Sequence, residues 1–448
     1  MAASPSPAPK TMLVLGLARS GVAVARLAAR EGWKVLVADD MPVATEGLPA
    51  TVERLDAAAA AGRLTEVDLV IPSPGVPASH PALVAAKASG VAVAPEIEFA
   101  ADRLGATLVA VTGTNGKSTT VSLLGAILEA AGRRVFTGGN LGDPLSNAVG
   151  RDDEFVVAEV SSFQLEHATT FHPHVAAMLN LTPDHLDRHG DMESYLAAKL
   201  RLFACLTPSD VVVLPEGADW ASRAAASTPA RVTTFDAAGA GSSRCIDRHG
   251  YRVQLPAEGW PELPHDLENV AAAVEVARVL GVEAGAVEKA VAAFRPLRHR
   301  LARVADVGGV GFWNDSKATN VGAAVSSLRA FEGRVVLLAG GISKGCDFGA
   351  LAREAARITL VVAYGESGPE IEAALAGSGI RVVREAGLHA ALGRAAREAR
   401  PGDSVLLAPA CASFDEFRDY ADRGASFERW VEELGCGPGV ESEEEVGG

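Results

Sequence analysis

Residues 110–120, AVTGTNGKSTT, combine the residue types that bind the phosphates of a nucleotide. Gly113 and Gly116 allow backbone N–H groups to turn toward a common centre. The ammonium group of Lys117 can reach the β- and γ-phosphates, and the hydroxyl of Ser118 can bind Mg²⁺. These residue types at this spacing predict a nucleoside-triphosphate site.

The loop is shorter than the common phosphate-binding pattern G-x-x-x-x-G-K-[ST], because Val111 stands where the first glycine would be. An apolar run over 107–111 precedes it and a helical run over 118–131 follows it, which is the context that a phosphate loop requires. A chance glycine turn with a surface lysine explains this context less well. A regulatory GTPase is a further alternative, but the chain contains no N-K-x-D guanine-binding sequence.

Side chains that could bind a metal follow two later apolar runs. Glu159 lies in the run FVVAEV, where an α/β sheet delivers side chains to a ligand. The next run leads into LNLTPDHLDRHG, which contains Asp184, His185, Asp187 and His189. Such a loop, taken alone, is more often a solvated turn, and its spacing does not define a metal geometry.

Three lysines stand out by their positions. Lys199 lies inside the helical run SYLAAKLRLF, where a lysine normally faces solvent. Lys317 and Lys344 lie in FWNDSKATN and GGISKGCDF, two loops after apolar strands, and APACASFDEFRDYADRG is a third such loop. Ligands bind at such loops in open α/β sheets, so both lysines could receive anions there.

The turn GLARSG at 16–21 follows a predicted strand over 11–17 and opens a predicted helix over 22–30. With Asp39 at the end of the next strand, this is the layout of a dinucleotide-binding fold, whose helix N-terminus attracts phosphate. Ala18 replaces the middle glycine of G-x-G-x-x-G. A turn that binds nothing, or one that binds another diphosphate, therefore fits equally well.

Apolar strand-like runs alternate with alanine-rich helical runs through most of the 448 residues, which predicts an α/β protein with more than one core. We predict three domains. They are a Rossmann-like N-terminal domain over 11–96, a central P-loop ATPase-like α/β domain over 97–296 and a Rossmann-like C-terminal domain over 297–435. Residues 1–10 and 436–448 are predicted to be disordered tails.

The composition excludes several classes of protein. The net charge of −15 argues against a nucleic-acid partner bound through its phosphates. No run approaches the roughly 18 apolar residues that a membrane span needs. The five cysteines are scattered and contain no C-x-x-C, which fits a reducing cytoplasm and neither a disulfide frame nor a zinc site.

Together these motifs resemble the Mur ligase family, the ATP-dependent amide ligases that build the peptide of bacterial cell-wall precursors. The resemblance spans 11–433 and is carried by GTNGKST, EVSSFQLE, NLTPDHLDRH, YLAAKLRLF, LRHR, NDSKATN and the lysine of GGISKG. GLARSG, GGNLG, NDSKATN and LLAPACASFDEFRDYADRG are most similar to the members that add D-glutamate. The D-N-P-R sequence of the diaminopimelate-adding members is absent, and folylpolyglutamate synthases lack a comparable first domain.

Two positions depart from the family pattern. Ala18 replaces a glycine in the first turn, and Asp266 stands where the family usually has the asparagine of a His-Asn pair. Asn269 keeps the second asparagine of that region.

The resemblance implies transfer of the γ-phosphate of ATP to the carboxylate of UDP-N-acetylmuramoyl-L-alanine (UDP-MurNAc-L-alanine). The amine of D-glutamate then attacks the acyl phosphate, and phosphate is expelled. Because several anions meet, the resemblance also implies two Mg²⁺ ions and several Lys and Arg residues. We expect a cytoplasmic monomer that acts on small molecules in peptidoglycan synthesis, without a nucleic-acid partner or membrane insertion.

The same resemblance implies roles for individual residues. The catalytic residues would be Lys117, His185, Lys199, Arg300 and Lys317. ATP would contact Gly113, Thr114, Asn115, Gly116, Lys117, Ser118, Thr119, Asn269, Arg300 and Asp315. The UDP-sugar would contact Arg19, Ser20, Asp39, Gly75 and Asn140. D-glutamate would contact Lys317, Thr319, Lys344, Ser413, Phe414 and Tyr420.

The implied metal ligands are Ser118, Glu159, His185 and Lys199. Lys199 would act as an N-carbamate, because neutral lysine and CO₂ yield an anion suited to a hard cation. Two alternatives remain for the whole chain. One is the family member that adds L-alanine to UDP-MurNAc, and the other is a nicotinamide-dependent oxidoreductase, which the turn GLARSG suggests.

Overall fold

The structure, a computed structural model, describes residues 10–39, 47–140, 142–238, 240–295, 298–345 and 347–435. The predicted tails lie outside these ranges except for Lys10, as do Cys346 and Cys436. The contacts of the chain define two compact units. One combines Met1–Leu181 with Glu193–Phe294, and the other combines Thr182–Met192 with Arg295–Gly448. The chain therefore passes between the units three times.

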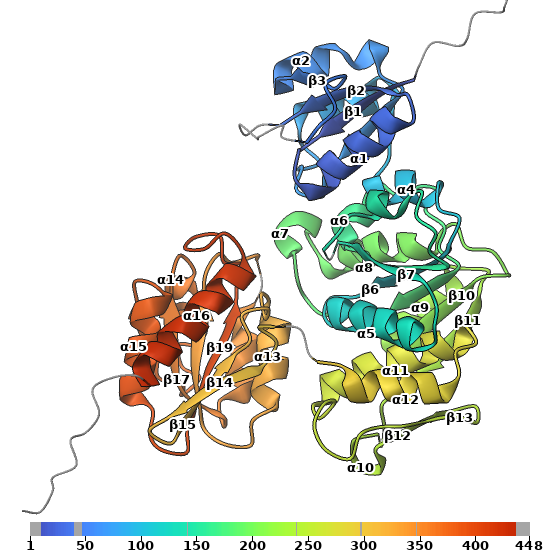
Figure 1. The fold of residues 1–448 in the computed structure, drawn as a ribbon. Helices are drawn as coiled ribbons and strands as arrows, with labels where there is room; N and C mark the ends of the chain where they lie inside the picture. The colour runs from blue at the N-terminus through green and yellow to red at the C-terminus, as the bar shows by residue number, and fades with distance from the viewer. Residues whose placement is uncertain are drawn as a thin grey trace, which may run out of the picture. The chain divides into compact units, whose positions relative to one another are not determined.

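The N-terminal part of the first unit contains a parallel five-stranded sheet with the order β3-β2-β1-β4-β5 (Figure 1). Its strands are β1 (Thr11–Leu15), β2 (Lys34–Ala38), β3 (Glu53–Leu55), β4 (Leu69–Pro72) and β5 (Ala92–Val93). Its helices are α1 (Arg19–Arg30), α2 (Ala57–Gly62), η1 (Leu64–Glu66), α3 (Pro81–Ala88) and α4 (Glu96–Ala101). Met12 and Val14 pack with α1, whereas Leu13 and Leu15 pack with α2 and α3. This burial on both faces explains why β1 is apolar throughout.

A second sheet of the first unit carries the phosphate loop. It is parallel, with the order β11-β10-β9-β6-β8-β7. Its strands are β6 (Thr107–Thr112), β7 (Val135–Gly139), β8 (Phe155–Glu159), β9 (Val175–Met178), β10 (Val211–Pro215) and β11 (Arg231–Phe235). Val109 and Val111 face a core shared with α5 (Lys117–Ala130), α11 (Pro264–Val279) and α12 (Ala284–Ala293). Leu108 and Ala110 face the opposite core, and this alternation determines which face of β6 packs against α5.

The remaining elements of the first unit lie around this sheet. They are η2 (Leu145–Ala148), α6 (Ser162–Leu165), α8 (Met192–Leu200), η3 (Arg201–Phe203), α9 (Asp219–Ala226), α10 (Ala240–Ser243) and the antiparallel hairpin of β12 (Cys245–Arg248) and β13 (Tyr251–Gln254). The sequence patterns did not indicate this hairpin. Helix α11 ends shortly before Gly281, whose φ of +73° lies in the left-handed region.

The second unit contains a six-stranded sheet with the order β14-β15-β19-β16-β17-β18 (Figure 1). Its strands are β14 (Ala302–Val307), β15 (Val310–Asn314), β16 (Val335–Gly340), β17 (Ile358–Tyr364), β18 (Val382–Glu385) and β19 (Ser404–Ala410). Only β14 among these strands pairs antiparallel, at one edge. The helices are α7 (Leu186–His189), α13 (Val321–Arg329), η4 (Phe348–Glu354), α14 (Gly368–Ala374), α15 (Leu388–Glu398) and α16 (Tyr420–Gly435).

The α/β class is confirmed, and the three larger sheets, which have five, six and six strands, fit a three-domain chain. The domain limits 11–96, 97–296 and 297–435 stay predictions. Among the helices that the structure describes, none is long and apolar enough to cross a membrane.

Glu96, the first residue of α4, is a buried carboxyl group whose ionisation opposes folding. It is 3% exposed, and its Oε1 accepts a hydrogen bond from the Ser146 backbone N–H at 2.6 Å. Burial raises the pKa of Glu96 to about 7 from its ordinary value of 4.5, and the hydrogen bonds to Ser146 oppose this shift only in part. When the pKa of a carboxyl group is higher in the folded state than in the unfolded state, its protonation contributes to the stability of the fold. This contribution is complete below the unfolded pKa and is lost as the pH rises through the folded pKa. This group therefore costs about 3 kcal/mol of stability at a pH above 7 relative to a pH below 4.5.

We expect Glu96→Gln to remove this pH dependence, because glutamine cannot ionise and still accepts the hydrogen bond. The Tm of the variant minus that of the wild type should increase between about pH 5 and about pH 8. Glu98→Gln is the matched control, since Glu98 is buried in the same helix but accepts three hydrogen bonds from Thr169 and Thr170. An equal Tm difference at both pH values for Glu96→Gln would contradict the prediction.

Candidate functional site

The phosphate loop joins β6 to α5, and two glycines give it its shape. Gly113 has φ +148° and Gly116 has φ +83°, the latter in the left-handed region at the N-cap of α5. A side chain on Gly116 would also collide with Oδ1 of Asn269, which comes from α11. A helical hydrogen bond runs from the Thr120 N–H to the Gly116 carbonyl, and the amides before it lie at the N-terminal end of α5. This end is suited to phosphate oxygens.

Two lysines lie against the same loop carbonyl. Lys117 Nζ donates to the carbonyls of Gly113 (2.9 Å) and Thr114 (2.8 Å). Lys199 Nζ, from α8, donates to the Gly113 carbonyl at 2.9 Å and lies 4.5 Å from the ring centroid of Tyr195. Lys199 is 1% exposed, so the usual expectation of a solvent-facing lysine is wrong for this helix. Two amino groups therefore meet at the phosphate loop.

Glu159 connects the loop to the neighbouring strand. β6 and β8 pair in parallel with Val111 opposite Glu159, which places Glu159 at the same sheet edge as the loop. Glu159 Oε2 accepts a hydrogen bond from the Ser118 hydroxyl at 2.7 Å, and Oε1 accepts one from the Asn140 side chain at 2.7 Å. Asn140, predicted to contact the UDP-sugar, thus lies beside a predicted metal ligand.

The oxygens of Glu159 and Ser118 fit a magnesium ion. Mg²⁺ in nucleotide sites takes one or two carboxylates from the protein, and phosphate oxygens and water complete its shell. Among the described residues no group of three His, Cys, Asp or Glu side chains is arranged to hold a metal by itself. Phosphate oxygens of a nucleotide would have to complete the shell of a metal ion at this position.

Asn180, two residues after β9, is a site residue for which no role was predicted from the sequence. Its Oδ1 accepts hydrogen bonds from the backbone N–H groups of Thr114 (3.1 Å) and Asn115 (2.8 Å), and its Nδ2 donates to the Asn115 carbonyl (3.0 Å). The Tyr195 hydroxyl reaches the hydroxyl of Thr114 at 3.4 Å. The motif NLTPDHLDRH marks this position, but its contact with the phosphate loop depends on the fold.

In the second unit, Asp184 lies close to two predicted site residues, Lys344 and His185. It accepts hydrogen bonds from Lys344 Nζ and from Asn320 Nδ2, both at 2.8 Å, and its Oδ2 lies 3.6 Å from Nε2 of His185. Burial raises the pKa of Asp184, but the charges of Lys344 and His185 and the hydrogen bonds from Lys344 and Asn320 outweigh it. The net pKa lies below the ordinary value, so Asp184 is an anion at neutral pH. His185 itself has φ +55°, in the left-handed region.

A buried arginine connects two loops of the third sheet. Arg423, on α16, is fully buried and donates to the hydroxyl and the carbonyl of Ser316, both at 2.9 Å, and to the Cys411 carbonyl at 3.2 Å. These contacts hold the loop NDSKATN against the loop APACAS. The sequence motif contained Arg423 without indicating this role.

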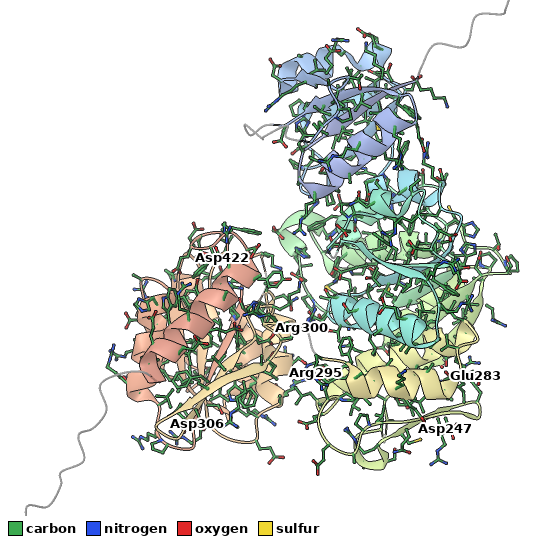
Figure 2. All side chains as sticks on the ribbon, in the orientation of Figure 1. Asp247, Glu283, Arg295, Arg300, Asp306 and Asp422 are labelled. Carbon is green, nitrogen blue, oxygen red and sulfur yellow. The ribbon has the colours of Figure 1, made fainter. Side chains whose placement is uncertain are left out.

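The other predicted residues of the second unit lie on the same loops. Lys317 Nζ is 3.8 Å from the ring centroid of Tyr420, and the carboxylate of Asp315 accepts a hydrogen bond from the Ser327 hydroxyl. Four more predicted residues belong to this unit: Thr319 and Arg300, both half-buried, the buried Ser413, and Phe414, which is 70% exposed. Arg300 lies just before β14 (Figure 2).

In the N-terminal sheet, the turn GLARSG departs from the dinucleotide pattern without strain. Ala18 caps α1 with φ −68° and ψ −175°, an ordinary extended conformation that does not require glycine. A side chain on Gly21, in contrast, would collide with the Gly16 carbonyl. The Asp39 carboxylate accepts a hydrogen bond from the Leu17 N–H and so supports the turn.

Three more residues predicted to contact the UDP-sugar lie in this part of the chain. The Arg19 side chain donates to the Gly142 carbonyl at 3.4 Å. Ser20 is half-buried in the first turn of α1, and Gly75 is exposed in the loop after β4.

The predicted residues fall into separate groups. Lys117, Ser118, Glu159, Asn140, Lys199 and Asn269 meet at the phosphate loop of the first unit. His185 and Lys344 meet through Asp184 in the second unit. The predicted metal set, which includes His185 with Glu159 and Lys199, is divided between the two units and stays a prediction.

Three domain models of one protein family match the chain in order. They are described as "Mur ligase MurD-like, N-terminal domain" over residues 10–95, "Mur ligase middle domain" over 111–254 and "Mur ligase, glutamate ligase domain" over 299–411.

Curated relatives are similar over nearly their whole length. A protein of Acidobacterium capsulatum is 42% identical over 94% of this chain and 96% of its own length, and one of Pelotomaculum thermopropionicum is 41% identical over 94% and 97%. Both are named UDP-N-acetylmuramoylalanine–D-glutamate ligase.

Solved structures share the fold at low sequence identity. The MurF ligase of Thermotoga maritima, in complex with ADP, is 17% identical with a TM-score of 0.59 over 95% of this chain and 96% of that one. The UDP-N-acetylmuramate–alanine ligase of the same organism is 18% identical with a TM-score of 0.57 over 96% and 100%.

Proposed function

Because this chain belongs to the Mur ligase family, we propose that it is the ATP-dependent ligase that adds D-glutamate to UDP-MurNAc-L-alanine. The observation that carries this proposal is the identity of about 40% to D-glutamate ligases along nearly the whole chain. The phosphate loop, with two lysines at one carbonyl, supports the use of ATP. The oxidoreductase alternative is set aside, because the family match includes the whole turn GLARSG.

The reaction needs activation because a carboxylate does not react with an amine at neutral pH. The enzyme transfers the γ-phosphoryl group of ATP to the L-alanyl carboxylate, which forms an acyl phosphate and ADP. The amine of D-glutamate then attacks the acyl carbon, the tetrahedral intermediate loses phosphate, and the new amide bond remains. The proton that the amine loses goes to a base or to solvent.

The first unit supplies the groups that hold the triphosphate. The amides of residues 116–119 and the ammonium group of Lys117 bind and orient its phosphates, and Asn269 lies against the loop where the nucleoside enters. Ser118 and Glu159 would hold one Mg²⁺, and His185 with the N-carbamate of Lys199 would hold a second. When bound, the ions neutralise negative charge that develops during phosphoryl transfer.

The second unit supplies groups for the nucleotide and the amino acid. Arg300 and Asp315 would contact ATP. Lys317 and Thr319 would bind the α-carboxylate of D-glutamate. Lys344, Ser413, Phe414 and Tyr420 would surround its side chain. Lys344 already donates a hydrogen bond to the carboxylate of Asp184 at 2.8 Å, and an interaction of this kind would bind the side-chain carboxylate of D-glutamate.

The turn GLARSG and its surroundings would hold the UDP-sugar. Arg19, Ser20, Asp39, Gly75 and Asn140 are the residues proposed for this role. We propose that the enzyme acts in the cytoplasm and as a monomer.

A substrate panel tests this function. ATP-dependent release of phosphate should be measured with UDP-MurNAc or UDP-MurNAc-L-alanine, each with D-glutamate, L-glutamate, D-alanine or L-alanine. We expect high kcat/KM only for UDP-MurNAc-L-alanine with D-glutamate. When both carboxylates of glutamate are bound, only one enantiomer directs its amine at the acyl phosphate. Preference for UDP-MurNAc with L-alanine would instead assign the chain to the L-alanine-adding ligases, and equal use of both glutamates would refute the two-point anchoring.

A further inference from the structure

We propose that Asn180 is a positioning residue for the nucleotide. Its side-chain amide fixes the Thr114–Asn115 segment of the phosphate loop, so that Lys117 and the amides that begin α5 face the phosphates. The inference rests on the proposed function, since it concerns how the same site binds ATP. Asn180 opens the motif NLTPDHLDRH, but no role was predicted for it, and only the fold brings it to the loop, from 65 positions further along the chain.

The contacts of Asn180 define the orientation of its amide. Oδ1 faces two backbone donors, the N–H groups of Thr114 and Asn115, whereas Nδ2 faces the Asn115 carbonyl. The reversed amide would place a donor against two donors and an acceptor against an acceptor, so only one orientation satisfies all three groups. The Asn180 carbonyl also accepts a hydrogen bond from the Thr114 N–H at 3.1 Å. The loop is therefore held from the side of β9 by one residue.

These contacts divide the loop into two parts with different tasks. The amides of Thr114 and Asn115 are directed at Asn180. The amides of residues 116–119 lie at the N-terminal end of α5, where the helix dipole favours anions. Gly116, which has a left-handed backbone conformation, joins the two parts. The orientation of the peptide before Gly116 therefore determines the direction of the amides of residues 116–119. Fixing the Thr114–Asn115 peptide before ATP arrives lowers the entropic cost of ordering the loop around the phosphates.

The backbone of the phosphate loop packs closely against the residues that follow β9. A side chain on Gly113 would meet Cβ of Leu179 at 3.1 Å and the backbone nitrogen of Asn180 at 3.3 Å. The loop therefore lies directly on the segment that carries Asn180. A shift of the Asn180 side chain would be transmitted to the loop without any intervening residue.

The test measures binding of ADP with Mg²⁺ to the full-length protein by calorimetry, without the other substrates. Asn180→Leu keeps a similar volume but removes all three side-chain hydrogen bonds, and we expect its Kd for ADP to be about ten- to a hundredfold higher. Asn180→Asp retains the two acceptor contacts and loses the donor, so its Kd should lie between those of Asn180→Leu and the wild type. In both variants the KM for D-glutamate should stay within about twofold of the wild-type value, because the residues proposed to bind that substrate lie in the second unit.

His174→Leu is the matched control. His174 Nδ1 accepts a hydrogen bond from the Leu108 N–H at 3.1 Å, near the other end of β6, so its loss perturbs the same strand away from the phosphates. Wild-type affinity for ADP in folded Asn180→Leu would overturn the proposal, as would equal weakening in His174→Leu. If Asn180→Leu does not fold, the same measurement is made on Asn180→Asp, and wild-type affinity of that variant for ADP would overturn the proposal. A wild type that binds no nucleotide would refute the proposed function rather than this inference.

Discussion

The Lys199→Ala variant should be nearly inactive, with kcat lower than that of the wild type by about three decades. Lys199 is buried, lies on the Gly113 carbonyl of the phosphate loop and is the residue proposed to carry a carbamate that binds Mg²⁺. Bicarbonate should not restore the variant, because the amine that reacts with CO₂ is absent. Acetate, whose carboxylate can occupy the vacated volume, should restore part of the activity.

The control for this prediction is Lys289→Ala. Lys289 lies in the middle of α12 and is exposed, so its removal should leave kcat unchanged. Full activity of Lys199→Ala would show that the carbamate assignment is wrong. Inactivity without acetate rescue, together with a Tm far below that of the wild type, would assign Lys199 a structural role instead.

The Lys117→Ala variant should lower kcat by about two to three decades, since a preorganised donor at a transferring phosphoryl group has effects of this size. Lys117 Nζ already lies on the carbonyls of Gly113 and Thr114, so its position is defined before the nucleotide binds. Formation of ADP that depends on D-glutamate is the measurement. The Tm should change little, because Lys117 lies at the end of a helix whose apolar side remains intact.

Activity of Lys117→Ala close to that of the wild type would mean that GTNGKST does not bind the γ-phosphate. Lys34→Ala is a suitable control, because Lys34 makes only an exposed ion pair with Glu66 in the N-terminal sheet. Surface pairs of this kind contribute little to stability, so the control should behave as the wild type.

Local sequence patterns predicted the strands and helices that carry the phosphate loop to within one or two residues. The loop lies between the end of β6 and the start of α5. Its limits are clear in the sequence because buried β-branched residues stop at a glycine and helix-forming residues follow the loop. The exposed strand β14 was missed, because ARVADV is only partly buried and its apolar residues do not alternate regularly. The N-terminal helix starts at Arg19 rather than Val22, since its first polar turn carries no apolar signal.

The contacts of the site depended on long-range packing that no local pattern contains. Lys199 is flanked by Ala198 and Leu200, as many exposed lysines are, and only the approach of α8 to the loop shows that it is buried. Asn180 reaches a loop that precedes it by 65 positions. The ion pair of Lys344 with Asp184 joins residues 160 positions apart. Resemblance to a family supplied the roles of Lys199 and Lys344, but not the partners that hold them.

The second unit is assembled from two separated stretches, which affects the protein while it is being made. Residues 182–192 leave the ribosome long before Asn320 and Lys344, the two partners of Asp184. At roughly 5–20 residues per second, the delay is on the order of ten seconds. A nascent chain that has reached the end of α12 contains the whole phosphate loop but not this ion pair. The carboxylate of Asp184 therefore lacks both of these partners until Asn320 and Lys344 have been synthesised, and a chain that stops at the end of α12 has the phosphate loop without the loops that would receive the amino acid.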